Sequence, residues 1–252
     1  MRTQNHGGIL VQSIDNVLAD ESFVVWPLGQ DPYCYELVRI LPGQPYTKSG
    51  LMRYCIYVLQ ASKDNLLIND APANRDEFAL GDAQELAITV QHEAAMVLVA
   101  SQLIKDITND NLHIHAIEGA KRVEKHWGHE IWLTGDPSRI FAFKRILLKA
   151  GNKTSLQYHR HKRETNFILS GTGMLHYNHE LTEPAERVKP SAISTVRLSG
   201  PCVVDVFPNL VHRLEALEDM QLYEISTPEL DDVVRLADDA GRRSGRISDE
   251  HA

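Results

Sequence analysis

The feature of this 252-residue chain that most restricts its fold is a long series of short apolar runs. The runs are rich in Val, Ile, Leu, Tyr and Phe, and turn-forming clusters such as PGQP, SKDN, TGDPS and LSGP separate them. They cover residues 22–26, 34–41, 54–59, 85–90, 95–101, 139–148, 165–171, 173–178, 191–198, 201–207 and 220–226. Many short strands at close spacing predict an all-β sandwich or barrel.

One helix is expected near the C-terminus, in the segment PELDDVVRLADDAG of residues 228–241. Val233, Val234 and Leu236 would form its short apolar stripe. Long helical periodicity is scarce elsewhere, so the prediction is an all-β chain with one short C-terminal helix.

The order of the runs also indicates a degenerate internal repeat. The segment ELVRILPGQPYTKSG of residues 36–50 is similar to KRILLKAGNKTSLQ of residues 144–157. In both segments a strand leads to a Gly turn, a polar stretch and another apolar strand. The repeat predicts two related β-domains, residues 1–115 and 116–252, with the boundary in the polar stretch around residues 105–125.

Charge and cysteine content exclude several classes of partner. The formal net charge of -8 argues against broad nucleic-acid binding and against attachment to an anionic membrane. Cys34, Cys55 and Cys202 are far apart and lack C-x-x-C spacing, so a disulfide framework is not expected. No run approaches the ~20 apolar residues of a membrane span, and the N-terminus lacks a signal-peptide pattern. A soluble, cytoplasmic protein is therefore expected.

The chemistry-bearing pattern begins at Gly151 and reads G-NKTSL-Q-Y-H-RHKR-E-TNFILS-G. Its fixed points are Gly151, Gln157, His159, Glu164 and Gly171. Two residues two apart on a strand point to the same face, so Gln157 and His159 would share one face. The RHKR stretch would turn the chain and bring Glu164 to the same barrel interior from a neighbouring strand.

This spacing resembles the first motif of the cupin superfamily, G-x5-H-x-H-x3/4-E-x6-G, with Gln157 in place of the first histidine. The segment GPCVVDVFPNLVHRLEA resembles the second cupin motif, with His212 at the histidine position. The usual P-x-G turn becomes Phe207-Pro208-Asn209, and Asn tolerates positive φ better than most residues. The resemblance implies one metal-binding barrel with Gln157, His159, Glu164 and His212 as ligands.

Within the superfamily, residues 120–242 look like the phosphomannose isomerase-type branch, as in the C-terminal part of type II mannose-6-phosphate isomerases. The similar segments are SLQYH, the Glu five residues on, the upstream WGHEIWLTG and the downstream HRLEALEDMQLYEISTPELDDVVRLADDAGR. The resemblance implies a bicupin, whose first half would be a metal-free cupin because it has no counterpart ligands. Its Tyr54 falls near the place of Glu164, and SGLMR replaces the Q-x-H stretch.

Two imidazoles, a carboxylate and an amide oxygen suit one divalent transition metal per chain, namely Zn, Mn, Fe, Co or Ni. Residues 141–163 are basic and contain no acid, which favours a phosphate or carboxylate pocket beside the metal. Lys144, Lys153 and Lys162 are the candidates for phosphate binding, and Lys144 or Lys153 for assisting proton transfer.

These features favour a metal-dependent sugar-phosphate isomerase that acts on a phosphosugar in carbohydrate or polysaccharide precursor metabolism. A homodimer is also expected. Two alternatives stay open. One is a non-haem iron dioxygenase, because His159, Glu164 and His212 would form its triad. The other is a non-catalytic module that binds a metal or a sugar.

Overall fold

A computed structural model of the chain describes the residues 2–6, 9–13, 24–25, 32–106, 111–134, 140–178, 193–229 and 231–245. It divides into two compact units. The N-terminal unit comprises Leu18–Lys121 and Leu133–Phe143, and the C-terminal unit comprises Met1–Val17, Arg122–Trp132 and Lys144–Ala252. The division at residues 115 and 116 stays a prediction, and the structure groups residues 1–17 with the second half of the chain.

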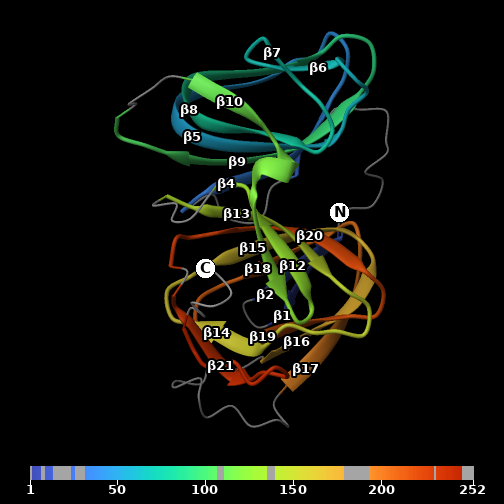
Figure 1. Ribbon diagram of the computed structural model, residues 1–252, viewed down its shortest axis with the longest axis vertical. Helices are drawn as coiled ribbons and strands as arrows, with labels where there is room; N and C mark the ends of the chain where they lie inside the picture. Colours follow the sequence, from blue (N-terminus) through green and yellow to red (C-terminus); the bar gives the residue numbers. More distant parts are fainter. Residues whose placement is uncertain are drawn as a thin grey trace. The chain divides into compact units, whose positions relative to one another are not determined.

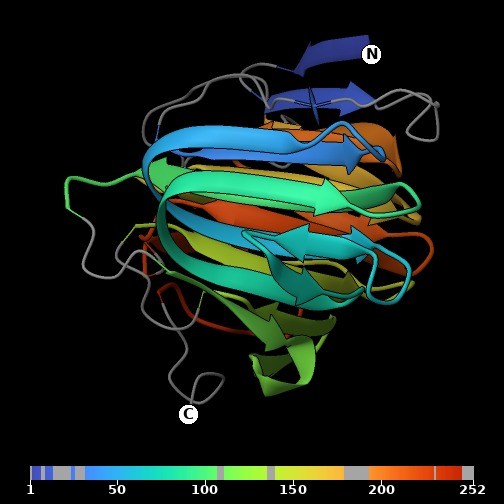
Figure 2. The same ribbon diagram turned by 90° about the horizontal axis from the view of Figure 1, so that it is seen from above.

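The N-terminal unit is built on one antiparallel sheet with the strand order β3-β4-β9-β5-β8-β6-β7, and β10 also pairs with β8. Its strands are β3 (Val24–Val25), β4 (Cys34–Ile40), β5 (Tyr46–Gln60), β6 (Leu66–Ile68), β7 (Ala71–Ala73), β8 (Glu77–Val90), β9 (Ala95–Leu103) and β10 (Asn111–Ala116). A 3-10 turn, η1 (Ile117–Gly119), follows β10. Figure 2 shows the long blue and green strands of this unit running side by side.

The C-terminal unit contains two sheets (Figure 1). The first has the order β1-β2-β18-β15-β20-β13-β12-β11, and the second has the order β17-β16-β19-β14-β21. The strands of the first are β1 (Arg2–His6), β2 (Ile9–Ser13), β11 (Lys121–Lys125), β12 (Gly128–Trp132), β13 (Ala142–Leu148), β15 (Glu164–Ser170), β18 (Cys202–Val206) and β20 (Met220–Ser226). Those of the second are β14 (Leu156–His159), β16 (Thr172–Asn178), β17 (Ile193–Ser199), β19 (His212–Ala216) and β21 (Val233–Ala237).

The core of the C-terminal unit lies between these two sheets. Alternate residues of β13, β15, β18 and β20 meet alternate residues of β16, β17 and β19 in one apolar cluster. Examples are Leu148 and Ile168 from the first sheet and Leu175 and Leu198 from the second, each 1% exposed or less. Apolar side chains at every second position therefore close two sheets into a jelly roll, as the sequence pattern predicts.

The expected C-terminal helix is wrong, because Val233–Ala237 forms strand β21 in its place. This strand pairs antiparallel with β14, with Val233 opposite His159 and Arg235 opposite Gln157. Adjacent β-branched Val233 and Val234 favour an extended chain, and pairing with β14 gives their backbone groups partners that a short isolated helix would lack. The described residues include no α-helix.

No helix in the described part of the chain is long and apolar enough to cross a lipid bilayer.

Candidate metal centre and its cavity

The residues predicted to bind a metal come from both sheets of the C-terminal unit. Gln157 and His159 lie on β14, and His212 begins β19 directly opposite Gln157. Glu164 begins β15 in the facing sheet. Because Gln157 and His159 are two residues apart on a strand, their side chains share the face that looks into the barrel. The spacing of the first motif and the pairing of β19 with β14 thus bring the four predicted residues to one place.

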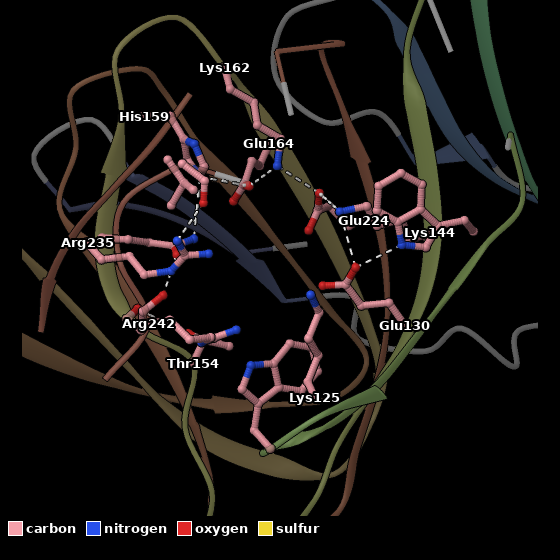
Figure 3. Close-up of a pocket in the computed structure, with 16 residues that line it drawn as sticks. Lys125, Glu130, Lys144, Thr154, His159, Lys162, Glu164, Glu224, Arg235 and Arg242 are labelled. Carbon is pink, nitrogen blue, oxygen red and sulfur yellow. Dashed lines mark hydrogen bonds and ion pairs between the residues drawn. The ribbon is translucent and has the colours of Figure 1, made fainter. Parts of the chain in front are cut away.

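The donor atoms of His159, Glu164 and His212 converge, and Figure 3 shows the contact between His159 and Glu164. His159 Nε2 lies 3.2 Å from Glu164 Oε1, and His212 Nε2 lies 3.3 Å from Glu164 Oε2. All three residues are buried. Ligands at about 2.1 Å from a metal and at right angles to one another are about 3.0 Å apart, so the observed separations fit a shared ion.

Hydrogen bonding sets the tautomer of His212. Its Nδ1 lies 2.9 Å from the carbonyl oxygen of Leu210, which can only accept a hydrogen bond. Nδ1 therefore carries the proton, and Nε2 presents its lone pair to the cluster, as a metal ligand requires. Burial lowers the pKa of His159, against the attraction of Glu164, which favours the neutral imidazole that binds metals.

Gln157 is held differently. Its Oε1 accepts a hydrogen bond of 2.5 Å from the hydroxyl of Ser155, while its Nε2 lies 3.4 Å from His159 Nε2. The amide nitrogen thus faces the other donors, and ligation through oxygen requires the amide group to turn over. Ser155 could then accept a hydrogen bond from Nε2. Gln157 as a fourth ligand stays a prediction.

The loop before His212 has the conformation that its sequence predicts. Asn209 has a φ of 66°, the left-handed value for which glycine is usual at this turn. Its backbone N–H donates a hydrogen bond of 2.6 Å to the carbonyl oxygen of His159. This bond ties the loop of the second motif to the strand of the first, so it fixes the two histidines relative to each other.

A chain of alternating buried charges extends from Glu164 across the first sheet. Lys162 forms an ion pair with Glu164 and, at 3.0 Å, with Glu224 Oε1. The ammonium group of Lys144 lies 3.6 Å from both Glu224 and Glu130 and 4.7 Å from the centre of the Trp132 ring. Each charge therefore has an opposite neighbour, which offsets the cost of burial.

These contacts shift the pKa values of the charged groups. Burial alone would raise the pKa of Glu130, but Lys144, Lys125, the Trp132 hydrogen bond and Lys162 lower it to about 2. Burial would likewise raise the pKa of Glu164, which Lys162 and His159 hold well below its usual value. The pKa of Lys162 is raised, because Glu164 and Glu224 outweigh its burial. All three side chains are therefore ionised at neutral pH.

A cavity of about 110 Å³ adjoins the predicted ligands. Five basic side chains and three carboxylates line it, and one of the five, Arg242, forms an ion pair of 2.7 Å with Asp238 outside the lining. The charged lining residues are Lys125, Lys144, Lys162, Arg235 and Arg242, with Glu130, Glu164 and Glu224. Figure 3 shows these side chains around the cavity, with Thr154 on the same wall as Arg242.

The structure separates the three predicted lysines. Lys144 and Lys162 line the cavity, whereas Lys153 does not and forms a half-exposed ion pair of 3.4 Å with Asp239. The predicted site residues did not include Lys125, Glu130, Glu224, Arg235 or Arg242. Glu130 lies in the segment WGHEIWLTG, and Glu224, Arg235 and Arg242 lie in the downstream segment of residues 212–242, but no spacing rule marked any of the five.

No protein-family model and no curated protein sequence matches the chain. Solved structures do match it. A glyoxylate-induced protein from Pseudomonas aeruginosa, so described, is 8% identical, with a TM-score of 0.66 and coverage of 90% of each chain. Oxalate decarboxylase from Bacillus subtilis, whose description names Mn(II) centres, is 10% identical with a TM-score of 0.58, covering 93% of this chain and 77% of that one.

Salicylate 1,2-dioxygenase from Pseudoaminobacter salicylatoxidans, in complex with gentisate, is 10% identical with a TM-score of 0.54, covering 77% of this chain and 68% of that one. These neighbours are cupin-fold proteins, and at such identities the likeness concerns the fold. The predicted cupin fold is confirmed. The finer resemblance to phosphomannose isomerases has no counterpart among these neighbours.

Proposed function

We propose that this protein is a metal-dependent cupin enzyme whose substrate is a small anionic molecule. One observation carries the proposal. The donor atoms of His159, Glu164 and His212 converge at the wall of a cavity that has an excess of basic side chains. Buried charges with strongly shifted pKa values in a cavity are typical of functional sites.

His159, Glu164 and His212 would hold the metal ion, with Gln157 as a candidate fourth ligand. When bound, a divalent metal supplies Lewis-acid chemistry at a substrate oxygen. The chemistry of the donor set makes Zn, Mn, Fe, Co and Ni the candidate metals. The description of the Bacillus subtilis neighbour names Mn(II) centres, which supports testing Mn first.

The chain's own basic side chains support an anionic substrate. Lys162 and Lys144 line the cavity with ammonium groups that also pair with buried glutamates, and Arg235 lines it from β21. Basic groups of this kind bind carboxylates and phosphates. Two structural neighbours have descriptions that name small carboxylic acids, oxalate for one and salicylate and gentisate for the other.

The reaction predicted from the sequence, a sugar-phosphate isomerisation, remains one candidate. In support, Lys144 lies at the cavity wall, where it is placed to bind an anion or to move a proton. An assay of the metal-loaded protein with mannose 6-phosphate and related phosphosugars tests it. The absence of turnover on every phosphosugar would exclude this reaction and leave the wider proposal standing.

A dioxygenase is the second candidate. Two histidines and one carboxylate are the donor set of non-haem iron oxygenases, and the amide oxygen of Gln157 is bound to Ser155 instead of facing this set. Oxygen consumption by the Fe(II)-loaded protein with salicylate, gentisate or oxalate tests this candidate. A protein that consumes no oxygen with any of them is not this kind of dioxygenase.

The wider proposal is tested by binding. Lys144→Met removes one cavity ammonium, and Lys153→Met is its matched control because Lys153 lies outside the cavity. Titration of the metal-loaded protein with oxalate and with inorganic phosphate should show binding that Lys144→Met weakens about 10-fold and Lys153→Met leaves unchanged. Equal effects of both variants, or no binding of either anion, would contradict the proposal.

A homodimer is proposed as the assembly, because exposed sheet edges are commonly covered by pairing between subunits. Sedimentation equilibrium of the full chain tests it, and a single species with the 28.4 kDa mass of one chain would exclude it.

A further inference from the structure

A second cavity of about 90 Å³ lies inside the barrel of the C-terminal unit. Its walls are mainly apolar, in contrast to the charged cavity. The apolar side chains are Trp127, Ile146, Leu148, Leu175, Val204, Val206, Leu214 and Leu222. They come from both sheets, at alternate positions of β13, β18 and other strands, so the cavity is the unfilled centre of the jelly roll.

The candidate metal ligands stand on the boundary between the two cavities. His159 lines only the charged cavity, His212 lines only the apolar one, and Glu164 lines both. Trp127, Glu130, Thr154, Gln157 and Glu224 also line both. A molecule held at these ligands therefore has a charged compartment on one side and an apolar compartment on the other.

Besides His212 and the polar residues shared with the charged cavity, one polar side chain, that of Asn166, lines the apolar compartment. Asn166 lies on β15 two residues after Glu164, is 5% exposed and lines this compartment. Its carboxamide lies on the same face of β15 as Glu164 and can both donate and accept hydrogen bonds. A buried amide is stabilised by a hydrogen-bond partner, which a molecule in the cavity can supply.

We infer that the substrate is a small carboxylic acid with a compact apolar body that enters this compartment and carries an oxygen that bonds to Asn166. The inference rests on the proposed function and names the substrate class of the same site. A cavity of 150 Å³ binds benzene, so a compartment of about 90 Å³ holds a body of about three or four carbon atoms.

The test is isothermal titration calorimetry on the full, Mn(II)-loaded chain with acetate, pentanoate and 4-oxopentanoate. Pentanoate adds three methylene groups to acetate and should bind about 50-fold tighter. Val204→Ile extends into the compartment, whereas Val203→Ile is the matched control on the next residue of β18, which does not line it. Val204→Ile should weaken pentanoate binding about 10-fold and leave acetate binding unchanged, and Val203→Ile should change neither.

Asn166→Leu tests the polar contact, because leucine has a similar size and no hydrogen-bonding group. This variant should weaken 4-oxopentanoate binding about 5-fold and leave pentanoate binding equal or tighter. If it weakens both acids equally, Asn166 is not a contact of the substrate oxygen and that part of the inference is overturned.

The remaining outcomes separate the two proposals. If acetate binds and pentanoate binds no tighter, or if Val203→Ile acts as strongly as Val204→Ile, the inference is overturned while the proposed function stands. Tighter binding of mannose 6-phosphate than of pentanoate also overturns it, because a polyhydroxylated sugar does not suit apolar walls. If none of these anions binds, the proposed function fails and the inference falls with it.

Discussion

At the scale of single residues, the four predicted ligands differ in how their donor atoms are held. The Leu210 carbonyl fixes the ring of His212, and Lys162 and the two histidines hold Glu164. Only the amide of Gln157 is turned so that its oxygen faces a serine. Residue 157 is therefore the position at which replacing the amide by another donor should change the metal affinity.

Replacing Gln157 by histidine should tighten metal binding about 10-fold, because imidazole is a stronger donor than a neutral amide. The side chain starts from the same strand position, opposite His212. Competition with a chromogenic chelator measures the affinity, and Gln221→His on β20, outside both cavities, is the control. An affinity unchanged by Gln157→His would show that residue 157 does not contact the metal.

Glu130 predicts a pH dependence of stability. Its pKa of about 2 is below the value of ~4.3 in an unfolded chain, so its ionised form stabilises the fold above that pH. The stabilisation declines as the pH falls from about 4.3 towards 2. At pH 7, Glu130→Gln should therefore lower the free energy of unfolding by about 3 kcal/mol.

Chemical denaturation of both proteins between pH 7 and pH 3 checks this prediction. The difference in unfolding free energy between the two proteins should decrease below about pH 4.3. A difference that stays constant over the whole range would mean that the charge of Glu130 does not stabilise the fold.

At the scale of elements, hydrophobic runs predict strands well and predict their ends poorly. The runs 165–171, 201–207 and 220–226 became β15, β18 and β20. Strand β5 is longer than its run, because it starts at Tyr46 in a polar stretch and pairs with β8 through an irregularity between Ser49 and Met52. Pairing with a neighbouring strand, which a local pattern does not contain, decides such boundaries.

The same limit applies to the site. Gln157, His159 and Glu164 are close in sequence, so their spacing alone brings them together. Glu224 and Arg235 reach the cavity from strands far along the chain, through the pairing of β20 with β15 and of β21 with β14. Arg235 was also missed because residues 228–241 were predicted to form a helix, whereas Arg235 lies on strand β21. Local spacing therefore predicts three of the candidate ligands, and the second motif adds His212, but neither predicts the charged cavity.

A buried ion pair joins neighbouring strands beside the site. Arg163 Nη2 lies 2.6 Å from Asp205 Oδ2, and Thr165 Oγ1 donates a hydrogen bond of 2.9 Å to Asp205 Oδ1. Arg163→Met would leave the Asp205 carboxylate buried without its cation, so the free energy of unfolding should fall by about 3 kcal/mol. Urea denaturation measures it.

The control is Arg122→Met, which breaks an exposed ion pair with Glu124. It should leave the stability unchanged, since exposed pairs contribute little. A similar loss of unfolding free energy in both variants would show that the stabilisation by the Arg163–Asp205 ion pair does not depend on its burial.

At the scale of the whole molecule, the chain combines two β-units of which one carries the metal-ligand motif. The N-terminal unit has a polar cluster of its own, where Glu36 accepts hydrogen bonds from Tyr46 at 2.5 Å and from Lys48 at 3.0 Å. Among the described residues, however, only His159, Glu164 and His212 form a group of metal-ligating side chains. A bicupin with one metal site remains our proposal for the organisation of the chain.

The metal content of the purified protein tests the central claim most directly. Elemental analysis after loading with Mn(II) or Zn(II) and removal of free ions should give about one metal per chain. It should give close to none for His159→Ala and for His212→Ala, because losses in the outer shell alone cost about 10–100-fold in affinity. The His113→Ala protein, altered at an exposed histidine of β10, is the control and should keep its metal. Two metals per chain, or a full complement in the His212→Ala protein, would contradict the account.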